Sequence, residues 1–150
     1  MNAKDLMIGD WVRTFLGECG RVTSIDIFQH TSNSIDVFGK TYDEDRIEAV
    51  LLTEEILKAN GFEDKSDKAR YGNVFYGLEH GNTSVTFEVD NGLPILTIED
   101  AADRSKQHNV ICLKDEVYNV HELQHALRLY GLNKMADNFK IERYGCSKRI

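Results

Sequence analysis

The first fifty residues fall into short segments rich in β-branched and aromatic residues, each closed by glycine or small polar residues. The segments span residues 10–15, 21–28, 34–38 and 46–51. The breaks between them contain Gly17, Gly20, Gly39 and the cluster Thr31-Ser32-Asn33. β-branched and aromatic residues favour strands, whereas glycine, serine and asparagine favour turns. Several short strands at this spacing predict a small β-barrel.

The run Gly9-Asp10-Trp11-Val12, followed by a glycine turn and Val22, resembles the opening of SH3-like barrels. This resemblance implies that the first strand enters the core. The turn that Ile8 and Gly9 make into the strand favours Trp11 closing one end of the barrel. Most aromatic side chains of so small a barrel are expected to be core residues, because rings bury large areas. The alternative is that they line a binding groove. The aromatic residues concerned are Trp11, Phe15, Phe28, Phe38 and Tyr42.

The remaining residues predict a short helix, an antiparallel sheet and a C-terminal helix. Thr53 can cap a helix that Glu54 and Glu55 favour at its start and that Gly61 ends. Strands are expected at residues 73–79, 84–90, 93–99 and 110–113. We therefore expect an α+β fold: an SH3-like β-barrel over residues 1–52, then an α+β unit over 53–150 with one C-terminal amphipathic helix.

Local signals refine this sheet. Asn91-Gly92 is a strong hairpin signal. Pro94 cannot donate a ladder hydrogen bond and therefore indicates an edge strand. Residues 63–68 are predicted to form a charged link and residues 100–107 a polar loop.

His121-Glu122-Leu123-Gln124-His125 spells H-E-x-x-H, the signature of zinc peptidases. Histidines four residues apart share one helix face and can hold one metal ion. The glutamate after the first histidine then serves as general base for a metal-bound water. This motif defines one alternative for the chain, a zinc-dependent hydrolase with His121 and His125 as ligands and Glu122 as the catalytic base.

Helix geometry argues against that alternative. At about 100° per residue, Leu123 and Leu127 fall on the apolar face, roughly opposite His121. His125 and Arg128 flank His121 on the polar side, so both histidines are expected to face solvent beside a cation. Leu123 and Leu127 are expected to be structural, and Gly131 is expected to end the helix.

A third zinc ligand is also missing. The extended form of the motif requires a glycine and a histidine where the chain has Arg128 and Gly131. Asp137 and Glu142 are the only acidic residues after the motif, and the tail has hardly room for a second ligand-bearing helix. Because a catalytic zinc needs three protein ligands, we expect no catalytic residue, metal or cofactor here.

Composition limits the partners. The formal net charge of −7 disfavours nucleic acid. The N-terminus has no apolar signal core, and no segment has the length of a membrane span. We expect a cytoplasmic protein that does not bind membranes. Three cysteines without a C-x-x-C pair, Cys19, Cys112 and Cys146, favour reduced thiols.

Three segments resemble a group of small uncharacterised proteins of Bacteroidetes phages and related mobile elements: residues 4–12, residues 52–62 and residues 120–127. In that group the third segment often reads V-H-x-L-Q-N, which implies that Glu122 and His125 are incidental as zinc-site residues. The group has no assigned activity. The resemblance implies a context of phage or mobile DNA and a role in contacting a host or phage component. Together with the missing third zinc ligand, this context leads us to expect a non-enzymatic interaction protein with a protein as its partner.

Overall fold

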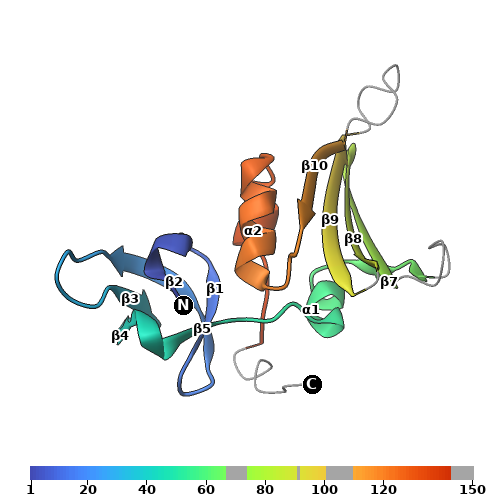
Figure 1. Cartoon of the computed structure of the whole chain (residues 1–150). Coiled ribbons are helices and arrows are strands. Elements are labelled where there is room, and N and C mark those ends of the chain that lie inside the picture. The colour runs from blue at the N-terminus through green and yellow to red at the C-terminus, as the bar shows by residue number, and fades with distance from the viewer. Residues whose placement is uncertain (67–73, 91, 101–109, 143–150) are drawn as a thin grey trace.

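The computed structural model describes residues 1–66, 74–90, 92–100 and 110–142. Over these residues the chain has an α+β fold with two five-stranded antiparallel sheets. We call residues 1–52 the front unit and residues 53–142 the back unit. Helix α2 (Val120–Leu129) stands between the two sheets (Figure 1). Among the described residues, no helix is long and apolar enough to span a membrane.

The front sheet has the strand order β4-β3-β2-β1-β5. Its strands are β1 (Trp11–Thr14), β2 (Cys19–Asp26), β3 (Ser34–Val37), β4 (Lys40–Asp43) and β5 (Ile47–Ala49). Residues 19–21 of β2 pair with β1, and the rest of β2, from Val22 on, pairs with β3, with a register shift between Val22 and Ser24. No ladder joins the edge strands β4 and β5 in the described part of the chain. The expected closed barrel is therefore not observed, although the expected β-structure is.

Strand β4 was not predicted, because Tyr42 is its single apolar residue and its flanking residues are polar. Two 3-10 helices complete the front unit, η1 (Ala3–Asp5) and η2 (Glu44–Arg46). The side chain of Glu44 accepts hydrogen bonds from Ala3 N (2.9 Å) and from Asn33 Nδ2 (3.1 Å). These bonds, that from Ala3 first, lower the pKa of Glu44. They fix the N-terminal segment against η2.

The front core is built mainly from aliphatic residues, and in β1 and β3 buried positions alternate with half-buried ones. Its buried members are Ala3, Leu6, Val12, Val22, Ile35, Val37, Tyr42 and Ile47. The prediction that most front aromatics are core residues is wrong. Phe15, Phe28 and Phe38 are 53%, 50% and 42% exposed, because they lie in the connections beyond the strand ends.

The back sheet has the order β10-β9-β8-β7-β6. Its strands are β6 (Glu63–Asp64), β7 (Val74–His80), β8 (Thr83–Asp90), β9 (Leu93–Asp100) and β10 (Val110–Asp115). The edge position expected from Pro94 is wrong, because β9 lies between β8 and β10. Pairing with β10 begins only at Ile95, so the missing N–H of Pro94 removes no bond of that ladder. Asn91 and residues 101–107 lie outside the described residues.

Three helices in the described chain accompany this sheet: α1 (Glu54–Ala59), α2 and α3 (Asn133–Asp137). Thr53 Oγ1 accepts from Ile56 N, which confirms the predicted cap of α1. Gly131 follows α2 with a φ of 79°, as expected of a helix stop. The tail was expected to have hardly room for a further helix after the motif, but α3 lies there.

The back core lies between the sheet and the helices. Leu123 and Leu127 are fully buried there, which confirms the predicted apolar face of α2. The larger members of this cluster are Leu57, Phe62, Tyr76, Phe87, Leu96, Ile98, Leu123, Leu127 and Phe139. Cys19 of β2 also belongs to it and forms a disulfide, which corrects the expectation of reduced thiols. The side chains of Cys112 and Cys146 lie outside the described residues.

Candidate functional site at the seam between the two units

Helix α2 begins with a cap that uses the glutamate of the H-E-x-x-H motif. The carboxylate of Glu122 accepts hydrogen bonds from the backbone N–H groups of Tyr118 (2.9 Å) and Asn119 (3.0 Å). An acidic side chain in this position satisfies free N–H groups at the positive end of the helix dipole. Both hydrogen bonds go to Oε2, so this oxygen of Glu122 is committed to the cap.

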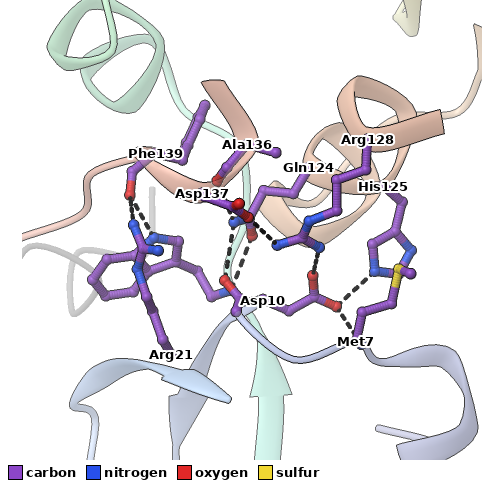
Figure 2. A network of polar contacts seen from close by, with 11 residues as sticks. Met7, Asp10, Arg21, Gln124, His125, Arg128, Ala136, Asp137 and Phe139 are labelled. Carbon is purple, nitrogen blue, oxygen red and sulfur yellow. Dashed lines mark hydrogen bonds and ion pairs between the residues drawn. The ribbon is translucent and has the colours of Figure 1, made fainter. Parts of the chain in front are cut away.

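Gln124 joins three separate parts of the chain. Its side chain is fully buried. Its amide oxygen accepts from Trp11 N at 2.9 Å, and its amide nitrogen donates to Gly9 O at 3.1 Å and Ala136 O at 3.0 Å. Figure 2 shows these bonds between the start of β1, α2 and α3. Sequence reasoning did not single out Gln124, although a glutamine beside an apolar stripe is a signal of a buried polar contact.

Asp10 is the second residue that connects the units, and it is fully buried. Its carboxylate lies 2.6 Å from His125 Nε2 and accepts from Arg128 Nη1 at 2.6 Å and from Met7 N at 2.8 Å (Figure 2). A buried carboxylate is tolerated only when it is paired and hydrogen-bonded. We call the contacts made by Asp10, Trp11, Gln124, His125 and Arg128 the seam.

The expectation that both histidines face solvent is wrong. His121 is only 8% exposed, and the His125 side chain is 26% exposed. The N-terminal segment of the front unit lies over this face of α2. A helical projection of α2 alone does not include contacts with other segments, so it could not predict this burial. The cation expected to oppose metal binding, Arg128, directs its charge at Asp10 and Asp137.

An open hollow of about 500 Å³ lies between η1 and α2. Its lining consists of Lys4, Asp5, Leu6, Met7, His121, Glu122 and His125. The rings of His121 and His125 are nearly perpendicular, with centroids 5.7 Å apart. Within the described ranges, no three His, Cys, Asp or Glu side chains are arranged to hold a metal ion. The motif residues therefore share a hollow without forming a three-ligand zinc site in this part of the chain.

Trp11 belongs to the seam and not to the front core. Val12 points into the front core, so strand alternation places Trp11 on the opposite face, where it packs against the back cluster. Its Nε1 donates to Phe139 O at 2.7 Å. The guanidinium of Arg21 lies 5.2 Å from the Trp11 ring centroid and donates to the same oxygen. The prediction that Trp11 closes the barrel end is wrong.

Comparisons with protein-family models, with curated proteins and with solved structures found no match for this chain.

Proposed function

We propose that this protein is a non-enzymatic interaction protein of phage or mobile-element origin, and that its front unit binds a host or phage protein. The observation that carries the proposal is the exposure of Phe15, Phe28 and Phe38. Single exposed apolar residues are ordinary on protein surfaces. Three exposed phenylalanines on three successive strand connections of one small unit are better explained by contact with a partner.

Local geometry supports this role for two of the rings. Phe15 packs edge-on against Tyr42, with centroids 6.3 Å apart, and Arg46 lies 4.9 Å from its ring centroid. The ring is thus held in place while half of the side chain stays exposed, and a rigid anchor loses little entropy on binding.

Phe38 is held in an unusual backbone conformation. Its φ is 55°, a region that residues with bulky side chains rarely adopt. The strain is of the kind that concentrates at functional positions. Its ring lies over Gly20, where an added Cβ would come within 2.5 Å of it. Gly20 leaves room for the Phe38 ring, and Phe38 keeps its strained backbone conformation. Both features support a functional role for the position of this ring.

We also propose a specific fold for the front unit, namely an SH3-like β-barrel. The strand order β4-β3-β2-β1-β5, the irregular β2 and the 3-10 helix between β4 and β5 support this assignment. A protein partner is favoured over nucleic acid because the chain carries a formal net charge of −7.

Pull-down from host and phage-infected lysates tests the proposal. The unaltered chain is compared with the double variant Phe15→Ser/Phe28→Ser and with a matched control on the back unit, Tyr118→Ser/Leu129→Ser. All four side chains are about half exposed or more, so both variants should keep the melting temperature. We expect the front variant to lose partners that the control retains. Retention of every partner by both variants would contradict a front binding surface.

Elemental analysis separates the proposal from the zinc-dependent hydrolase. We expect the purified chain to contain far less than one zinc ion, because the described residues supply two imidazoles and a glutamate held in a helix cap. One tightly held zinc per chain, lost in His125→Ala, would replace the proposal by the hydrolase.

A further inference from the structure

The hollow beside α2 gathers several side chains that can coordinate a metal ion. They are the imidazoles of His121 and His125, the carboxylates of Asp5 and Glu122 and the thioether of Met7. Oε2 of Glu122 is committed to the helix cap, and Asp5 and Met7 are exposed, whereas the two imidazoles are mostly buried. Imidazole nitrogen is the ligand preferred by Cu²⁺, Ni²⁺ and Zn²⁺.

The two rings are close to the separation that one metal ion requires. A metal ion holds each imidazole nitrogen at about 2.0–2.1 Å, which places two rings on a tetrahedral ion with centroids about 5 Å apart. The observed separation is 5.7 Å, with the rings at 79° to each other.

Asp10 supplies an observation that does not depend on the spelling of the motif. A metal-binding histidine usually donates its second ring N–H to a carboxylate, which fixes the ring and raises its basicity. His125 Nε2 lies 2.6 Å from Asp10 Oδ2, so a neutral His125 donates there and keeps Nδ1 as the nitrogen that can bind a metal. Asp10 is itself held by Arg128 and by the backbone of Met7.

We propose that the hollow binds one divalent transition-metal ion of the Cu²⁺, Ni²⁺ and Zn²⁺ class through His125 Nδ1 and a ring nitrogen of His121. Water and the flexible side chains at the rim complete the coordination. Two fixed ligands give weaker binding than a three-ligand catalytic site, so the ion is lost on purification. Because Asp10 of the front unit orients His125 of the back unit, metal binding is coupled to the integrity of the seam. This proposal is independent of the partner surface proposed above.

Calorimetric titration of the full, tag-free chain with Ni²⁺ at neutral to mildly alkaline pH tests the site. We expect one ion per chain, bound in the micromolar range, with binding lost in His121→Ala and in His125→Ala. His80→Ala is the matched control, since His80 is an exposed histidine at the end of β7. We expect Asp10→Asn to weaken binding about 10–100-fold without abolishing it, as orienting residues around metals do.

His125→Gln protects the test against misfolding, because its amide can still donate to Asp10 while the imidazole is gone. Trp11 emission, which reports on the seam, verifies that each variant is folded. Cu²⁺ added to the unaltered chain should give an electron paramagnetic resonance spectrum with coupling to two nitrogens. Absence of one-site Ni²⁺ binding in the unaltered chain would overturn the proposal. So would undiminished affinity in folded His121→Ala and His125→Gln.

Discussion

Three phenylalanines of the front unit and three of the back unit differ sharply in exposure. In the back unit Phe62, Phe87 and Phe139 are at most 6% exposed, whereas in the front unit Phe15, Phe28 and Phe38 are at least 42% exposed. Composition alone cannot account for this, because both halves are rich in phenylalanine. The difference lies in position: the front rings occupy connections, and the back rings Phe87 and Phe139 lie on a strand and on the segment after α3.

Core size explains how the front unit folds without those rings. Its core consists mainly of valine and isoleucine, which fill the space between short strands. The back cluster is larger and needs rings to fill the space between the sheet and α2. Phe15, Phe28 and Phe38 are therefore not needed to fill the front core, whereas Phe62, Phe87 and Phe139 belong to the back core.

A pair of phenylalanine truncations gives the largest expected contrast. Phe87→Ala should lower the free energy of unfolding by about 3–5 kcal/mol, because it leaves a cavity in the back core. Phe28→Ala should change it by less than about 0.5 kcal/mol, as expected for an exposed side chain. Urea unfolding measures both. Similar losses in the two variants would mean that the front rings are structural.

Two leucines of α2 sharpen the comparison within one element. Leu127 is fully buried and Leu129 is 76% exposed, although both have the same side chain on the same helix. Leu127→Ala should cost about 2–5 kcal/mol, and Leu129→Ala should cost about 0.5 kcal/mol or less. Thermal unfolding monitored by circular dichroism provides the measurement. A large effect at Leu129 would reveal a contact that burial does not predict.

Gln124 tests whether the seam holds the two units together. Gln124→Ala removes the acceptor for Trp11 N and the donor to Gly9 O and Ala136 O, and buried groups left without a partner cost about 1–3 kcal/mol each. Some relaxation and hydration follow, so we expect a net loss of about 2 kcal/mol. Gln29→Ala on the front surface is the control and should be neutral. A neutral Gln124→Ala would show that packing alone maintains the seam.

The smallest expected effect is spectroscopic. Trp11 is the only tryptophan, half-buried between Arg21 and the C-terminal segment. Its emission should lie between those of buried and exposed tryptophan, with partial quenching by iodide. Arg21→Ala should shift it to the red, and Arg13→Ala should not, because Arg13 pairs with Glu48 of the neighbouring strand β5. Fully accessible emission in the unaltered chain would place Trp11 on a free surface.

Local patterns predicted much of the fold. Alternation located four of the five front strands, and the cap at Thr53 and the apolar face of α2 were correct because they depend on neighbours in sequence. The failures concern contacts between distant residues. The cover over His121, the place of Trp11 between the units and the role of Gln124 all arise from pairs more than 100 residues apart.

The candidate site could be predicted only as a list of residues. His121, Glu122 and His125 do line one hollow, but the sequence could not indicate that Glu122 is held in a cap or that Asp10 orients His125. From the sequence, Asp10 could be identified only as a residue at the start of the first strand. Asp10 orients His125 because the front unit packs against α2, and no local sequence pattern predicts that contact.

The membership of Cys19 and Val50 in the back cluster has a consequence for how the chain comes apart. In a fragment ending at residue 52, these side chains and one face of Trp11 would be exposed to solvent. The complementary fragment would lose part of the interior of its own core. We therefore expect unfolding to be a single cooperative transition of the whole chain, and each half expressed alone to be unstable and prone to aggregation.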